Sequence, residues 1–205
     1  MRDALAVYVD YTCRYSYRAM HWLDLLPDLK VEWRTFSLKE VNKQEDEPSW
    51  LEADSTPSLS VLAQALAHAA READFGHYHH AVFEAMIGEE RRLGEDDFYA
   101  LAAEAGVDVD AFKADRGAWV AGVGVEHYDA VDRLGVYGTP TVVLDGAASY
   151  IRLAAVPGSA KEAMAVIDGL DGIASSPANL VEIFRPPEPH HHAPMQIGVF
   201  GQDSP

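Results

Sequence analysis

The stretch Asp10-Tyr11-Thr12-Cys13-Arg14-Tyr15-Ser16 decides the fold, because it carries the single cysteine of the chain across a turn between a predicted strand and a predicted helix. Ala4–Val9, which precedes it, is short, apolar and partly β-branched, as in a buried strand. Tyr15–Leu26, which follows, has apolar residues at helical spacing and ends at Pro27. A thiol at the first turn of such a helix meets unpaired backbone N–H groups and the positive end of the helix dipole, which both favour the thiolate. The polar neighbours of Cys13 also argue against a buried structural cysteine, so the sequence predicts a reactive one.

The next segment extends this unit. Val31–Leu38 alternates apolar and polar residues, which is typical of a strand with one buried face. Strand, helix and strand in succession predict a βαβ unit with parallel strands and a right-handed crossover. Residues 39–56 are polar and acidic, and we expect a loop there with at most a short helix.

Residues 58–134 change to a helical pattern. We expect about four or five helices, one of them over His77–Arg92. Gly106 and Gly135 are expected to end helices, and Asp108 to begin one. This block predicts an all-α helical subdomain inserted into an α/β frame.

The α/β frame resumes after Gly135. Thr141–Leu144 and Tyr150–Leu153 are expected to pair as antiparallel strands across the turn Asp145-Gly146, and Ser159–Leu170 to form a final helix. Leu180–Phe184 is a candidate for a short added strand. The predicted organisation is a discontinuous α/β domain of residues 1–57 and 135–175, a helical subdomain of residues 58–134, and a C-terminal extension of residues 176–205.

The amino-acid composition excludes several classes of function. The chain has 205 residues with 16 Lys+Arg and 33 Asp+Glu, a formal net charge of −17. A field of that sign repels nucleic-acid phosphates and anionic lipid headgroups, so we expect neither nucleic acid nor membrane as a partner. One cysteine excludes an internal disulfide framework and a cysteine-rich zinc site. The N-terminal apolar run is too short for a signal-peptide core, and we expect a cytoplasmic protein.

In order and spacing, these features resemble the DsbA-like branch of the thioredoxin superfamily. The resemblance spans roughly Leu5 to Leu170 and rests on the Cys13 stretch, the helical insertion and Gly135-Val136-Tyr137-Gly138-Thr139-Pro140-Thr141. It implies a thioredoxin fold with the insertion described above. It also implies that Pro140 follows a cis peptide bond and faces the nucleophile, and that Thr139 offers its backbone to a bound peptide or thiol.

The resemblance assigns roles to the residues around Cys13. Cys13 would be the nucleophile, and Ser16 and Arg14 would tune it, Ser16 by lying within hydrogen-bond reach of the sulfur. Tyr11 and Tyr15 flank Cys13 and are candidates to line an aromatic pocket. The sulfur is expected within van der Waals range of the Thr139-Pro140 segment.

One departure from the family pattern leaves three functions open. DsbA-like oxidases carry Cys-x-x-Cys, whereas this chain has Cys13-Arg14-Tyr15-Ser16 and cannot hold an intramolecular disulfide there. The first function is single-thiol exchange with a protein thiol or with glutathione or mycothiol as cosubstrate. The second follows from a similarity to the Ser-Pro-Tyr-Ser motif of kappa-class glutathione transferases and hydroxychromene carboxylate isomerases, in which Cys13 takes the place of the serine that activates a bound thiol. The third is an inactive thioredoxin-fold module that binds a peptide.

Cofactors and remaining segments complete the expectations. We expect no tightly bound cofactor and no metal site, and His77, His79 and His80 are expected on a solvated or half-buried helix face. The insertion is expected to form one wall of the groove beside Cys13, with His77, Tyr78 or Phe83 as candidates. The apolar stretch Met195–Phe200 is expected to be buried on the body or in a homodimer.

Overall fold

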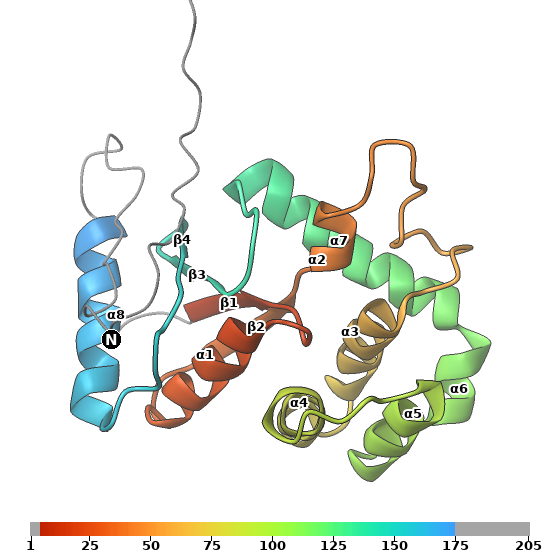
Figure 1. The fold of residues 1–205 in the computed structure, drawn as a ribbon, viewed down its shortest axis with the longest axis horizontal. Coiled ribbons are helices and arrows are strands. Elements are labelled where there is room, and N and C mark those ends of the chain that lie inside the picture. Colours follow the sequence, from red (N-terminus) through yellow and green to blue (C-terminus); the bar gives the residue numbers. More distant parts are fainter. Residues whose placement is uncertain (1–4, 175–205) are drawn as a thin grey trace, which may run out of the picture.

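A computed structural model describes residues 5–174 of the chain. In these residues a mixed four-stranded sheet with strand order β2-β1-β3-β4 carries helices around it (Figure 1). The elements, in chain order, are β1 (Leu5–Val9), α1 (Arg14–Asp24), β2 (Val31–Thr35), α2 (Leu38–Val41), α3 (Leu59–Ala70), α4 (Phe75–Phe83), a π-helical turn η1 (Glu84–Gly88), α5 (Glu95–Glu104), α6 (Val109–Ala114), α7 (Arg116–Leu134), β3 (Thr141–Leu144), β4 (Ala147–Tyr150) and α8 (Ala160–Ala174).

The sheet confirms the predicted βαβ unit and hairpin. β1 and β2 pair in parallel in the register Leu5 to Val31, and β3 pairs antiparallel with both β1 and β4. The turn between β3 and β4 has positive φ at Asp145 (47°) and Gly146 (81°), as a two-residue hairpin requires. Because the turn is so tight, the partner strand begins at Ala147. The prediction of that strand over Tyr150–Leu153 was therefore wrong in register.

The two faces of the sheet are covered by different helices. Leu5, Val7 and Val9 alternate along β1 and belong to the main core, which also contains buried residues of α1 and α8. The indole N–H of Trp22 in α1 donates to the carbonyl of Ala163 in α8 (3.0 Å), which joins these two helices. Tyr8 points the other way, into a second cluster with Phe36, Ala130 and Val136, in which α7 and the segment after it cover the sheet. β1 is thus buried on both faces, in agreement with its continuous apolar sequence.

Residues 59–134 form helices joined by short connections, and α3–α6 gather at one end of the molecule in Figure 1. Asp108 caps α6 by accepting a hydrogen bond from the N–H of Ala111 (3.0 Å), and Gly135 ends α7 with a left-handed φ of 66°. Both were predicted. The predicted helix over His77–Arg92 was wrong at its end, since Glu90 has a φ of 52° that no α-helix can continue through.

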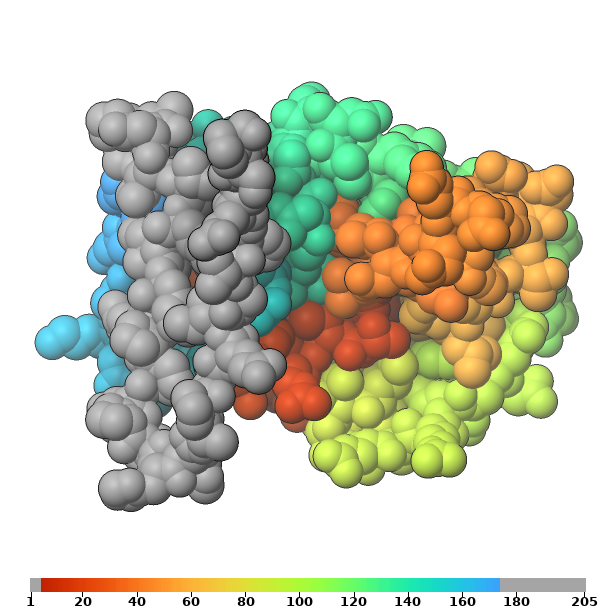
Figure 2. Space-filling view, turned by 45° about the horizontal axis from the view of Figure 1, so that its top comes forward, coloured from red at the N-terminus to blue at the C-terminus, as the bar shows by residue number. Residues whose placement is uncertain are grey.

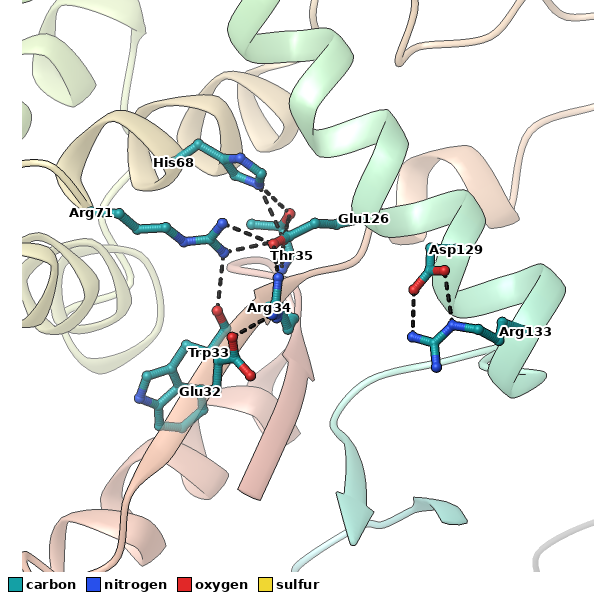
Figure 3. A network of polar contacts seen from close by, with 9 residues as sticks. All are labelled: Glu32, Trp33, Arg34, Thr35, His68, Arg71, Glu126, Asp129 and Arg133. Carbon is teal, nitrogen blue, oxygen red and sulfur yellow. Dashed lines mark hydrogen bonds and ion pairs between the residues drawn. The ribbon is translucent and has the colours of Figure 1, made fainter. Parts of the chain in front are cut away.

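A buried glutamate ties two helices of this region to the sheet (Figure 3). The carboxylate of Glu126 in α7 accepts hydrogen bonds from the Thr35 N–H (2.8 Å) and from Arg71, the residue that ends α3 as its C-cap (2.8 and 3.1 Å). It also contacts His68 of α3 (3.1 Å) and the Arg34 guanidinium of β2 (2.9 Å). Burial would raise the pKa of Glu126, but the hydrogen bonds from His68 and Arg71 and the charge of Arg71 outweigh it. The pKa therefore lies well below its usual value.

Several predictions fall outside residues 5–174 or stay untested. The expected strand at Leu180–Phe184 and the expected burial of Met195–Phe200 lie outside the described residues. The division into residues 1–57 with 135–175, 58–134 and 176–205 stays a prediction. Among the described helices, none is long and apolar enough to cross a membrane.

Candidate active site

Cys13 lies at the junction predicted for it, immediately before α1. Its backbone is extended (φ −93°, ψ 112°), and it is the N-cap residue of an 11-residue helix. The Cys13 N–H donates to the Asp10 carbonyl (3.0 Å), and the Tyr17 N–H donates to the Cys13 carbonyl (3.1 Å). These two bonds fix the turn, and Cys13 as a whole residue is left 9% exposed.

The segment before β3 faces the sulfur, although it is more than a hundred residues away in sequence. Cys13 Sγ lies 3.3 Å from the carbonyl oxygen of Thr139, which is the contact predicted between the thiol and the Thr139-Pro140 segment. The Thr139–Pro140 peptide bond is cis. The Ile151 N–H donates to the Pro140 carbonyl (3.1 Å), so the chain that leaves β4 runs beside this segment.

Asp10 holds the Cys13 turn to the start of α2. One carboxylate oxygen accepts from the N–H (2.8 Å) and hydroxyl (2.6 Å) of Thr12, and the other accepts from the Leu38 N–H (2.8 Å) and the Gln64 amide (3.0 Å). Asp10 is fully buried, and burial raises its pKa despite these four hydrogen bonds, which oppose the shift. The same carboxylate therefore positions two walls of the region around Cys13.

Ser16 and Tyr11 lie away from the pocket that opens at Cys13. The Ser16 hydroxyl is fully buried and accepts the Asp10 N–H (3.4 Å), and no hydrogen bond joins it to the Cys13 sulfur in the part of the chain that the structure describes. The Tyr11 hydroxyl pairs with His79 Nδ1 (3.0 Å), and its ring packs on Tyr78 and Phe83. Tyr11 was predicted to line the pocket and instead belongs to the core, because apolar residues of α4 cover the back of the turn.

His79 is part of this core cluster, not of the solvated or half-buried face expected for it. Burial, and to a smaller extent the nearby His80, lowers the pKa of His79 to about 3, so the imidazole is neutral. His77 is exposed, and His80 pairs with Asp24 (3.2 Å). Within residues 5–174 no group of three or more His, Cys, Asp or Glu side chains is arranged to hold a metal ion.

A cavity of about 350 Å³ opens beside the sulfur. Its lining comes from four places in the chain: the Cys13 turn, α2, the segment before β3, and the end of β4. The lining residues are Cys13, Tyr15, Leu38, Val41, Asn42, Tyr137, Gly138, Thr139, Tyr150 and Arg152. Tyr15 and Thr139 were predicted, whereas Arg14 is exposed and does not line the cavity.

The helical insertion does not line this cavity, which contradicts the prediction that it forms one wall. Tyr78 and Phe83, named as candidates, are fully buried behind the turn. α2 and the residue after it take that place, because the chain that leaves β2 turns first into α2 at the rim. Figure 2 shows the orange segment with α2 next to the teal segment that leads into β3. The Glu40 carboxylate secures α2 by accepting from Tyr128 of α7 (3.0 Å) and from the Trp50 N–H (2.8 Å).

Arg152 is the charged residue of this lining, and it was not predicted from the sequence. Its guanidinium carbon lies 5.3 Å from the ring centroid of Tyr15 and 5.2 Å from that of Tyr150, and its Nε donates to the Tyr150 hydroxyl (2.6 Å). The hydrogen bond with Tyr150, followed by the negative charges that Tyr150, Tyr15 and Cys13 carry when ionised, raises the pKa of Arg152 against the effect of burial. In the sequence, the spacing of Tyr150 and Arg152 is the only indication that their side chains lie on the same side of the chain. Which side faces Cys13 follows only from the register of the β3–β4 hairpin.

The order of the strands, the helices inserted between β2 and β3, and the cysteine at the start of α1 define a thioredoxin-fold protein with a helical insertion. Residues 4–165 match the model of the DSBA-like thioredoxin domain, and the chain belongs to this family. A comparison with curated proteins gives no match.

Solved structures share the fold at low sequence identity. One is a 2-hydroxychromene-2-carboxylate isomerase (TM-score 0.59, 18% identity, covering 88% of this chain and 100% of that one). Another is the cytosolic disulfide reductase DsbM from Pseudomonas aeruginosa with GSH (TM-score 0.59, 19% identity, 83% and 100%). A third is a probable DsbA oxidoreductase from Streptomyces coelicolor (TM-score 0.57, 18% identity, 87% and 94%). At sequence identities of 18% to 19%, this similarity establishes a shared fold and nothing about the reaction.

Proposed function

We propose that the protein is a thiol-disulfide oxidoreductase that works through the single thiol of Cys13 and a low-molecular-weight thiol. The observation that carries this proposal is the position of the sulfur, which lies at the N-terminus of α1, 3.3 Å from the Thr139 carbonyl and at the wall of an open cavity. A thiolate there can attack one sulfur of a disulfide that enters the cavity.

The reaction proceeds in two exchanges. In the first, the Cys13 thiolate bonds to one sulfur of the substrate disulfide, and the other sulfur leaves as a thiolate. In the second, the thiolate of glutathione or mycothiol attacks the substrate-derived sulfur of the mixed disulfide and releases Cys13 as thiolate. The substrate disulfide is thereby converted into one thiol and one new mixed disulfide, and the enzyme returns unchanged.

The cavity residues supply binding. Thr139 offers its backbone to the incoming group, Pro140 shapes that segment, and Tyr15 packs against the ligand. Arg14 and Ser16 stay candidates for tuning the thiol, Ser16 only through the Asp10 N–H that it accepts. The protein DsbM is described as cytosolic and was solved with GSH, which supports a cytoplasmic protein with glutathione as cosubstrate. A protein thiol as substrate and a homodimer as assembly belong to the same proposal.

The test is catalysis of glutathione-dependent reduction of bis(2-hydroxyethyl) disulfide, followed through NADPH oxidation by glutathione reductase. We expect turnover by the natural chain and no turnover by Cys13→Ser. After incubation with oxidised glutathione alone, the intact mass of the natural chain should show one glutathione adduct. Circular dichroism of Cys13→Ser serves as the control for folding. Equal rates with the natural chain, Cys13→Ser and no protein would reject the proposal.

A second candidate is isomerase or kappa-type transferase activity on a small aromatic substrate. It is favoured by the three tyrosine rings of the cavity, Tyr15, Tyr137 and Tyr150, of which the last two lie 5.1 Å apart. Here the thiol cofactor is held without a covalent bond, and Cys13→Ser should keep activity. Conversion of 2-hydroxychromene-2-carboxylate in the presence of glutathione separates the two candidates. A chain that is inactive in both assays would be a binding module.

A further inference from the structure

Arg152 places a positive charge in the cavity beside Cys13, and no acidic residue among residues 5–174 pairs with it. The chain carries 33 Asp+Glu, yet no carboxylate lines this cavity. Arg34 and Arg71 pair with Glu126, Arg116 with Glu95, and Arg133 with Asp129. Within residues 5–174 Arg152 has no such partner. Its Nε binds Tyr150, whereas Nη1 and Nη2 have no hydrogen-bond or ion-pair partner there.

The structure also holds Arg152 in place from both sides. The residue before it, Ile151, donates its N–H to the Pro140 carbonyl (3.1 Å). The residue after it, Leu153, accepts a hydrogen bond from Arg18 of α1 (2.8 Å). The guanidinium itself lies against the rings of Tyr15 and Tyr150. A side chain fixed in this way loses little conformational freedom when it binds a ligand.

We infer that Arg152 binds the carboxylate of a thiol or disulfide ligand whose sulfur reaches Cys13. A guanidinium with two free terminal nitrogens matches a carboxylate in a bidentate arrangement, and the absence of competing acids leaves that place to the ligand. A cavity of about 350 Å³ is within the range that holds small ligands. This inference rests on the proposed function and narrows it. Glutathione has two carboxylates and mycothiol has none, so the cavity selects glutathione or another carboxylate-bearing thiol.

The experiment compares two small disulfides of similar size that differ in charge. The first is 3,3′-dithiodipropionate, with a carboxylate at each end, and the second is neutral bis(2-hydroxyethyl) disulfide. The second-order rate constant of adduct formation on Cys13 is measured by intact mass spectrometry for each disulfide. Each rate constant is then divided by that for the reaction of the same disulfide with N-acetylcysteine amide in the same buffer, which corrects for the intrinsic reactivity of the disulfide. The ratio of the two normalised rates reports the preference of the protein for a carboxylate.

We expect this ratio to be about tenfold for the natural chain, as one charge-assisted interaction in a partly open cavity provides. Arg152→Gln should lower this ratio to about one or below, because it should slow the reaction with the dicarboxylate far more than the reaction with the neutral disulfide. Circular dichroism checks that the variant is folded. Arg152→Lys should keep part of the preference, since it keeps the charge without the planar fork. Arg91→Gln, which removes an exposed arginine of the insertion, is the charge-matched control and should keep the full ratio.

Two results overturn the inference and leave the proposed function standing. One is adduct formation by the natural chain without preference for the carboxylate. The other is an equal loss of both rates in Arg152→Gln, which would mean that Arg152 acts on the thiol and not on the ligand. If no disulfide forms an adduct with the natural chain, the proposed function fails, and the inference fails with it.

Discussion

Asp10 shows how one buried carboxylate can organise the turn that carries Cys13 without touching the thiol. Its two oxygens accept four hydrogen bonds, from Thr12, Leu38 and Gln64, and these residues come from three separate parts of the chain. The carboxylate therefore couples the Cys13 turn to α2, the wall that closes the cavity.

Replacing Asp10 with alanine should destabilise the protein by about 3 kcal/mol, because the variant removes all four of these hydrogen bonds, one of them from the fully buried amide of Gln64. Urea unfolding followed by circular dichroism measures the loss. Glu45→Ala removes an exposed acid in the loop after α2 and is the control, with an expected change of less than about 0.5 kcal/mol. Equal stability of Asp10→Ala and the natural chain would mean that water replaces the carboxylate in the turn.

The site residues differ in how far the sequence could predict them. Cys13, Thr139 and Tyr15 follow from local sequence context and family resemblance, and the structure brings them together at one cavity. Tyr11 could not be placed, because its direction depends on α4, whose residues arrive from more than sixty positions away. Arg152 depends on the pairing of β4, which the composition of Ala147–Tyr150 does not indicate, since alanine and serine have weak strand preference.

At the scale of elements, the helical region is attached to the sheet mainly through α7 and α3. Glu126 belongs to α7 and contacts Thr35 of β2 and His68 of α3, so a single side chain connects three elements (Figure 3). The existence of these helices was predictable from apolar periodicity and capping residues. Their position was not, because the wall of the cavity depends on where α2 turns after β2, and residues 39–56 contain no pattern that reveals this turn.

Glu126→Gln should lower the free energy of unfolding at pH 7 by about 2 kcal/mol, since hydrogen bonds between charged groups are replaced by weaker ones. Arg34 and Arg71 are about one-third exposed (35% and 32%), and solvent screening keeps the loss below that of a fully buried pair. The folded-state pKa of Glu126 lies below its usual value of 4.5, so the carboxylate binds its proton more weakly in the folded chain. Its stabilisation is therefore complete above pH 4.5 and is lost as the pH falls through the folded-state pKa.

Urea unfolding of both chains at pH 7, 5 and 4 measures this difference, which should shrink at the lowest pH. Asp129→Asn is the matched control, because Asp129 lies one turn further along α7 and pairs with Arg133 on the exposed surface (2.7 Å). It should have no measurable effect. A difference that is constant with pH would show that Glu126 contributes by packing and not by charge.

At the scale of the whole molecule, the charge distribution acts on an anionic ligand in two opposite ways. The net charge of −17 repels anions at a distance, whereas Arg152 attracts them inside the cavity. Long-range attraction and repulsion between exposed charges are screened over about 10 Å at 0.1 M salt, and a contact inside the cavity is screened less. Salt should thus act on the approach of a ligand and leave its final contact with Arg152 largely intact.

The reaction of Cys13 with a cationic disulfide isolates the long-range field. Cystamine carries positive charges that the acidic surface attracts, so raising the salt concentration from about 0.02 to 0.2 M should slow its adduct formation several-fold. Bis(2-hydroxyethyl) disulfide has no charge, and its rate should stay constant. With 3,3′-dithiodipropionate, Arg152→Gln is left with the repulsion alone, and its rate should rise with salt. A cystamine rate that does not change with salt would mean that the acidic residues lie too far from the mouth of the cavity to attract a ligand. The preference for a charged ligand would then depend on Arg152 and its tyrosine neighbours alone.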